Sequence, residues 1–237
     1  MWKSYHIYNV DYLNFIDEVS ILKKNYFDYQ SSFFFTVYAD FKGIHYRLRI
    51  KEEFIEEIEL LEENMNKFFG KLNIEKRIYD PEIIKYGNNL EAYETFSSLI
   101  SEYLISIPGK TNDKLFSGQE VLQFMKIILE HFDVYDDIQI YKSIKFWEET
   151  KKFYRSTITK EVYGNLQFNK NNILQISDVI NIIDTKSIEE RREMCFNFIH
   201  LTINRFNFNI KDECLLYYKL FELKREAISK TLLLHRQ

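Results

Sequence analysis

The sequence predicts an α+β protein, with antiparallel strands in the first third and a mostly helical carboxyl-terminal half, folded as a single domain over residues 1–237. Segments with the alternation or aromatic richness of strands all lie before residue 80. Later segments repeat apolar residues at helical spacing. The chain is 46% hydrophobic in 237 residues, which suits one core, because single cores stop growing only beyond roughly 250–300 residues.

The first elements form a strand, a helix and a hairpin. Large and polar residues alternate over residues 2–8, which predicts a strand, and apolar residues recur near helical period over 10–27. An aromatic and β-branched run over 32–38, a turn at 40–43 and strict alternation over 44–50 predict a β-hairpin.

The next segment, 51–69, is acidic and apolar at helical spacing and ends at Gly70, a residue type that often ends helices. Another strand is expected over 72–79, before a break at Pro81. A further helix is expected over 91–105.

The remaining elements are helices, and no domain boundary is placed among them. Segment 160–184 is rich in Asn and Ile without a clear period, so either an ordered insertion or a mobile loop is expected there. The predicted helices cover residues 117–133, 140–155, 187–206 and 212–234.

Composition excludes several classes of protein. With 32 basic and 36 acidic residues the net charge is −4, so the positive surface of a general duplex nucleic-acid binder is missing. Cys195 and Cys214 have no paired spacing and the five histidines are scattered, so neither a zinc site nor a disulfide framework is expected. No stretch approaches about 18 consecutive apolar residues and the first six residues lack a signal-peptide core, which predicts a cytoplasmic protein without a membrane span.

The segment His45-Tyr46-Arg47-Leu48-Arg49 is the first candidate for chemistry. Side chains alternate along a strand, so His45, Arg47 and Arg49 share one face. Two adjacent arginines can hold a carboxylate or phosphate through paired, charge-assisted hydrogen bonds. The alternative is an ordinary solvated or salt-bridged polar face of an amphipathic strand.

Two further segments carry candidate residues. Residues 81–87 place Glu82 and Lys85 on one helical face, although a turn with ordinary capping also explains this pattern. Near the end of the chain, His200 shares a helical stripe with Asn204. Histidine is the usual general acid or base, yet a lone histidine on an apolar helix is often a packing residue.

Taken in order, these segments resemble the thiopeptide-type bacteriocin biosynthesis family, from Trp2 to about Ala227. That family includes the carboxyl-terminal glutamate-elimination domain of class I lantibiotic dehydratases and the pyridine-forming cyclases of thiopeptide pathways. The segments that carry the resemblance are Tyr38-Ala39-Asp40, His45-x-Arg47-x-Arg49, Pro81-Glu82-x-x-Lys85-Tyr86-Gly87 and His200-x-x-x-Asn204-Arg205.

The resemblance implies roles for seven residues. Those implied to be catalytic are His200 for proton transfer and Arg47 and Arg49 for recognition of an esterified glutamate. Those implied to bind substrate are Lys85, His45, Tyr86 and Asn204. Lys85 stands where the family pattern has arginine, so a bidentate grip on a carboxylate is not available there.

The resemblance also implies a reaction: a lyase removes glutamate from glutamylated Ser or Thr in a ribosomally made precursor peptide, leaving dehydroalanine or dehydrobutyrine. No metal or organic cofactor is expected. The partners expected are the precursor peptide with its leader and a separate tRNA-dependent glutamylation subunit, because the chain has no glutamylation module. A homodimer is compatible with the sequence.

Two alternative functions stay open. A thiopeptide pyridine synthase would join two dehydroalanines in a formal [4+2] cycloaddition and then release water and the leader peptide. A non-catalytic partner would only present the peptide, since the 21 Phe and 17 Tyr supply residues for a peptide groove.

Overall fold

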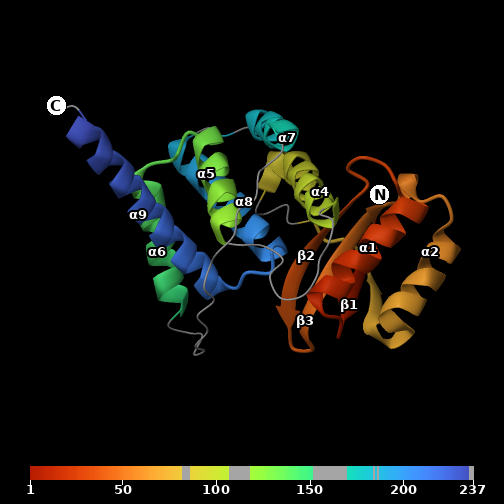
Figure 1. Cartoon of the computed structure of the whole chain (residues 1–237). Coiled ribbons are helices and arrows are strands. Elements are labelled where there is room, and N and C mark those ends of the chain that lie inside the picture. The colour runs from red at the N-terminus through yellow and green to blue at the C-terminus, as the bar shows by residue number, and fades with distance from the viewer. Residues whose placement is uncertain (82–85, 107–117, 152–169, 184, 186, 235–237) are drawn as a thin grey trace. The chain divides into compact units, whose positions relative to one another are not determined.

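The computed structural model describes residues 1–81, 86–106, 118–151, 170–183, 185 and 187–234 (Figure 1). The chain divides into two compact units. The first contains Met1–Asp113 and Lys170–Asp184, and the second contains Lys114–Asn169 and Thr185–Gln237. The single-domain organisation stays a prediction.

The first unit is built on a four-stranded antiparallel sheet with the order β2-β3-β1-β4. The predicted hairpin is confirmed, and its turn closes at Gly43, whose φ of +116° favours glycine. The predicted strand 72–79 is shorter in the structure. The strands are β1 (Trp2–Tyr8), β2 (Phe33–Asp40), β3 (Gly43–Lys51) and β4 (Ile74–Arg77).

One face of the sheet is apolar and packs against α1 (Tyr12–Tyr26), which lies across the sheet in Figure 1. Phe15 of α1 stacks on Tyr46 with ring centroids 4.1 Å apart and meets Phe35 edge-on at 5.1 Å. Asp11 caps the helix, because its side chain accepts a hydrogen bond from the backbone N–H of Asn14 at 3.0 Å. Because these rings bury one face of the sheet under α1, only the opposite face can carry a functional site.

The predicted helix 51–69 is wrong in its first third. Strand β3 extends to Lys51, whose backbone N–H donates to Ser32 at 2.8 Å, and a short 3-10 turn follows at Glu52–Phe54. Helix α2 (Ile58–Met65) begins only afterwards and runs into a π-helical turn, Asn66–Gly70. Strand pairing therefore overrides the helical pattern at the start of this segment.

Helix α4 (Leu90–Ser106) covers the free edge of β2. The backbone N–H of Phe35 donates to Ser101 Oγ at 3.1 Å, and that of Ser31 donates to Glu102 Oε1 at 2.7 Å. An edge strand normally leaves such donors open to water or to another chain. Helix α7 (Lys170–Asn181) packs against α4, so this part of segment 160–184 is ordered, while residues 160–169 lie outside the described residues.

The second unit is helical throughout its described residues. Ser187 caps α8 by accepting a hydrogen bond from the backbone N–H of Glu190 at 3.1 Å. Helix α6 packs against α9, while α5 packs against α8 and α9. The helices are α5 (Gly118–His131), α6 (Asp137–Lys151), α8 (Ile188–Arg205) and α9 (Ile210–Leu234).

The predicted fold class is confirmed, because a sheet at the amino terminus is followed by a mostly helical chain. Within the described residues, no helix is long and apolar enough to cross a bilayer. In the same part of the chain, no three His, Cys, Asp or Glu side chains gather closely enough to hold a metal ion. Cys195 and Cys214 are both buried free thiols.

Candidate functional site

The second face of the sheet carries the side chains of His45, Arg47 and Arg49 from β3. Strand register pairs Arg49 with Ser4, Arg47 with His6, and His45 with Tyr8. We call Ser4, His6, His45, Arg47 and Arg49 the cationic face. Because paired residues on neighbouring strands point to the same side, these five side chains form one continuous polar patch.

Arg49 is a buried cation on this face. Its residue is 6% exposed, and Nη1 makes only a long contact of 3.5 Å to the Leu48 carbonyl oxygen. Its guanidinium lies 5.6 Å from the ring centre of Tyr79. The pKa of Arg49 is lowered to about 10, mainly by burial and to a smaller extent by repulsion from Arg47. Among the described residues, no Asp or Glu oxygen lies within 4.0 Å of it.

Arg47 is held by an aromatic ring instead of an acid. Its guanidinium carbon lies 3.3 Å from the ring centre of Tyr38 on β2, and its Nε is buried with no hydrogen-bond partner in the described parts of the chain. A planar guanidinium stacks well on an aromatic ring and leaves its edge N–H groups available. Two neighbouring arginines thus share this face without an acidic counterion from the described residues.

Two histidines line the same face. His45 is fully buried, its Nδ1 lies 3.9 Å from Asp40 Oδ1, and its ring stacks on His6 with centroids 4.9 Å apart. Burial, Arg49 and Arg47 together lower the pKa of His6 to about 4. Both effects disfavour a further positive charge, so His6 is neutral at physiological pH.

An aromatic rim borders Arg49. Glu94 of α4 accepts hydrogen bonds from the Trp2 indole at 2.9 Å and from the Tyr79 hydroxyl at 2.7 Å. Each oxygen of this carboxylate therefore has its own neutral donor. Tyr86, one of the substrate-binding residues expected from the sequence, is buried and stacks on Tyr93 at 3.9 Å. Lys85 lies outside the described residues.

His200, in the second unit, forms an acid–base pair with a buried glutamate. His200 Nδ1 lies 2.8 Å from Oε2 of Glu213, which is 1% exposed. Burial raises the pKa of Glu213, although His200 and Trp147 oppose this. The His200 side chain keeps 30% of its surface exposed, and its ring lies 5.2 Å from that of Trp147. A carboxylate at Nδ1 fixes the ring and leaves Nε2 for proton transfer.

Asn204 lies one turn beyond His200 and is half-buried in the last turn of α8. Its backbone carbonyl accepts a hydrogen bond from the N–H of Asn207 at 3.0 Å. His45, Arg47 and Arg49 come together in the first unit, whereas His200 and Asn204 belong to the second. A single cavity that joins the two groups stays a prediction.

The family model described as "Lantibiotic biosynthesis dehydratase C-term" matches residues 2–223 of this sequence. The chain belongs to the lantibiotic dehydratase C-terminal family. The match includes both the cationic face and the His200–Glu213 pair. Comparison with curated proteins yields no match.

Among solved structures, this lantibiotic dehydratase C-terminal chain is similar to the crystal structure of the tRNA-dependent lantibiotic dehydratase MibB from Microbispora sp. 107891. The TM-score is 0.60 at 15% sequence identity. The match covers 100% of this chain and 28% of that protein, so the chain corresponds to little more than a quarter of MibB. At this identity the likeness concerns the fold.

Sequence reasoning missed two polar residues of this family member. His6 lies opposite Arg47 only because β1 pairs with β3, a long-range pairing that the alternation of residues 2–8 does not specify. Glu213 lies 13 residues beyond His200 on the next helix. One sequence pattern could have indicated Glu213. It stands near the start of the predicted helix 212–234, which directly follows the predicted helix of His200.

Proposed function

We propose that this domain eliminates glutamate from glutamylated Ser or Thr in a precursor peptide and leaves dehydroalanine or dehydrobutyrine. The observation that carries the proposal is the pair Arg47 and Arg49 on one strand face: Arg49 is buried, Arg47 is half-buried with its Nε fully buried, and neither has an acidic partner among the described residues. An unpaired buried charge is costly, and a bound carboxylate would relieve that cost. Glutamate attached through one carboxyl group still carries another.

The proposed reaction is a β-elimination. A base removes the Cα proton of the esterified residue, the Cβ–O bond breaks, a Cα=Cβ double bond forms, and glutamate leaves as a carboxylate. His200 is the proposed base, because Glu213 Oε2 at 2.8 Å holds its ring and stabilises the imidazolium that forms. Arg47 and Arg49 hold the departing glutamate and stabilise its negative charge. We propose that both groups act on one bound ester.

The neutral His6 fits the same scheme. A second imidazolium beside two guanidinium groups would be strongly disfavoured, whereas a neutral imidazole can donate one hydrogen bond to the bound carboxylate. Its stacking on the buried His45 at 4.9 Å limits rotation of the ring. We therefore place His6 with Arg47 and Arg49 in glutamate binding.

The proposed partners follow from the reaction. The substrate is a precursor peptide with its leader, and the glutamyl ester comes from a separate tRNA-dependent enzyme. The name of MibB, a tRNA-dependent lantibiotic dehydratase of which this chain matches 28%, supports a tRNA-dependent origin of the ester. The alternative pyridine synthase has no glutamate to bind, and it leaves unexplained two arginines that have no acidic partner among the described residues.

The test is to incubate the purified chain separately with two synthetic peptides. One carries glutamyl-Ser behind a leader, and the other is an azole-containing peptide with two dehydroalanines. We expect mass spectrometry to show loss of glutamate from the first and no change in the second. Release of the leader from the second peptide would instead support cyclisation. Binding of both peptides without conversion would support the presenting-partner role.

Arg49→Lys sharpens the same assay. Lysine keeps the charge but loses the planar pair of donors that matches a carboxylate. We expect the glutamylated peptide to accumulate with this variant while the circular dichroism spectrum is unchanged. The control is Arg77→Lys, because Arg77 on β4 of the same sheet is exposed and already paired with Glu75. Equal turnover by both variants would contradict a role for the Arg49 guanidinium.

A further inference from the structure

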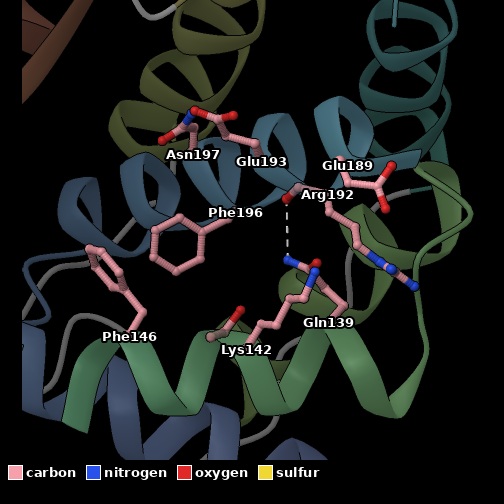
Figure 2. Close-up of a pocket in the computed structure, with 9 residues that line it drawn as sticks. Gln139, Lys142, Phe146, Glu189, Arg192, Glu193, Phe196 and Asn197 are labelled. Atoms are coloured by element: carbon pink, nitrogen blue, oxygen red, sulfur yellow. Dashed lines mark hydrogen bonds between the residues drawn. The ribbon is translucent and has the colours of Figure 1, made fainter. Parts of the chain in front are cut away.

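A pocket of about 410 Å³ lies between α6 and α8, within the second unit (Figure 2). Its volume falls in the range of about 300–1,000 Å³ that is usual for ligand pockets. The lining mixes aromatic rings, charged groups and a buried carboxamide, and α6 and α8 both contribute. The lining includes Gln139, Lys142, Phe146, Glu189, Glu193 and Phe196.

One end of the pocket is apolar and borders His200. Phe146 and Phe196 meet edge-on, with ring centroids 5.0 Å apart, and Figure 2 shows them facing one another from the two helices. Phe146 is 49% exposed, so part of this apolar surface is open to a ligand. Trp147 lies 5.6 Å from Phe196 and 5.2 Å from His200. A ligand on these rings would therefore lie about one helical turn from His200.

The other end carries acidic groups. Glu189 and Glu193 are exposed and have no ion-pair partner in the described parts of the chain. The neighbouring Arg192 is neutralised by Asp136. Lys142 on the opposite wall supplies one positive charge against these two carboxylates. The lining is thus net negative and favours a basic group.

Gln139 adds a group that suits a peptide backbone. It is 3% exposed, and its Nε2 donates to the backbone carbonyl of Arg192 at 3.2 Å, the contact drawn in Figure 2. Its side-chain oxygen receives no hydrogen bond from the described residues and can accept one from a peptide N–H. The pocket therefore suits an extended peptide: the carboxamide would contact its backbone, the two rings an apolar side chain, and the two acids a basic side chain.

We propose that this pocket binds a segment of the substrate peptide in which a basic residue stands two positions from an apolar one. The inference rests on the proposed function in taking a peptide as the substrate. Along α8, Glu193 and Glu189 stand about 4.5 and 10.5 Å from Phe196. In an extended chain, residues two apart lie about 7 Å apart and point to the same side. An apolar side chain on Phe146 and Phe196 therefore brings that basic group between the two carboxylates.

Fluorine NMR of the full chain labelled with fluorotryptophan tests this, because the chain has only two tryptophans. Trp147 adjoins the pocket, Trp2 lies in the first unit and serves as the internal control, and a Trp2→Phe spectrum assigns the signals. The probe is the capped peptide Lys-Ala-Leu-Ala-Lys, whose lysines flank leucine at the proposed spacing in both chain directions. The matched peptide Ala-Lys-Leu-Lys-Ala has the same composition but places its lysines on the opposite side.

We expect the first peptide to shift the Trp147 signal and to bind about five-fold more tightly than the second, since an exposed ion pair contributes up to about 1 kcal/mol. Glu189→Gln with Glu193→Gln should remove that preference, whereas Glu149→Gln, an exposed acid of α6 outside the pocket lining, should keep it. Phe146→Ala should weaken both peptides, and Tyr141→Ala, 56% exposed on the same helix, should not. Equal affinity of the two peptides, or no response of Trp147 to either, would overturn the inference.

The result is separable from that of the proposed function. If Trp147 responds as expected but no glutamate is lost from the glutamylated peptide, the pocket stands and the elimination proposal fails. If glutamate is lost while Trp147 responds to neither peptide, elimination stands and the pocket inference fails.

Discussion

Replacement of Arg49 by methionine should stabilise the free protein while removing its activity. Burial and Arg47 lower the pKa of Arg49 to about 10, which makes its charged form about 3 kcal/mol less favourable than in water, at about 1.4 kcal/mol per pH unit. The contacts with Leu48 and Tyr79 offset about 1 kcal/mol of this. Arg49→Met should therefore raise the free energy of unfolding by about 2 kcal/mol.

Thermal unfolding followed by circular dichroism measures this effect. For a chain of this size, about 2 kcal/mol corresponds to a rise in Tm of roughly 4–8 °C. Arg77→Met is the control, because Arg77 is exposed and paired with Glu75, and it should change stability by less than about 0.5 kcal/mol. A lower Tm for Arg49→Met would show that the Arg49 charge is satisfied within the protein, and the argument for an anion site would fail.

Glutarate, a dicarboxylate with the carbon skeleton of glutamate, completes this test. A ligand that binds only the folded state at ten times its Kd adds about 1.4 kcal/mol of stability. Glutarate should therefore raise the Tm of the original protein and of Arg77→Met, but not that of Arg49→Met. An equal rise in all three proteins would refute glutarate binding at Arg49.

Three further predictions follow from buried or shifted groups. Glu213→Gln keeps the shape of its side chain but loses the charge that stabilises the His200 imidazolium, so kcat should fall at least about ten-fold with little change in KM, as measured by mass spectrometry of the elimination product. His6 has a pKa of about 4 in the folded protein against an ordinary 6.5. Between these values the unfolded chain binds a proton that the folded protein does not, so the free energy of unfolding falls as the pH drops from 6.5 towards 4. In urea unfolding, the free energy of unfolding of His6→Gln should therefore fall by about 1 kcal/mol less between pH 7 and pH 5 than that of the original protein, after allowance for the partial exposure of His6. Ser101→Ala leaves the buried N–H of Phe35 without its acceptor and should cost about 1–2 kcal/mol in the same assay, whereas the exposed Ser106→Ala should cost almost nothing.

The elements that sequence reasoning found are those with a strong local pattern. Strict alternation over residues 44–50 and the aromatic run before it gave the β2–β3 hairpin, and helical spacing gave α1 and α8 within a few residues. The helix over 51–69 failed at its start because the backbone of Lys51 pairs with Ser32, a contact outside the local pattern. Helix α7 was not predicted, since its apolar residues meet α4 from far along the chain.

The candidate site divides in the same way. The shared side of His45, Arg47 and Arg49 follows from alternation along one strand, which the register of β3 bears out. The identity of their neighbours depends on which strand lies next to β3. His6 was therefore beyond reach, because it meets Arg47 across strands that the sequence alone does not pair, whereas Glu213 was missed although its place early in the helix after that of His200 could have indicated it.

The strand order has a consequence for how the chain folds during synthesis. Strand β1 leaves the ribosome first, yet it lies between β3 and β4, so the sheet cannot be completed until Arg77 has been made. The packing of α4 waits longer, because α7 follows after residues 114–169 of the other unit. Such long-range contacts slow folding and leave apolar surface exposed in the nascent chain. The two units are therefore interleaved in synthesis, and Arg49 becomes a buried charge only after the strands on both sides of β3 are in place.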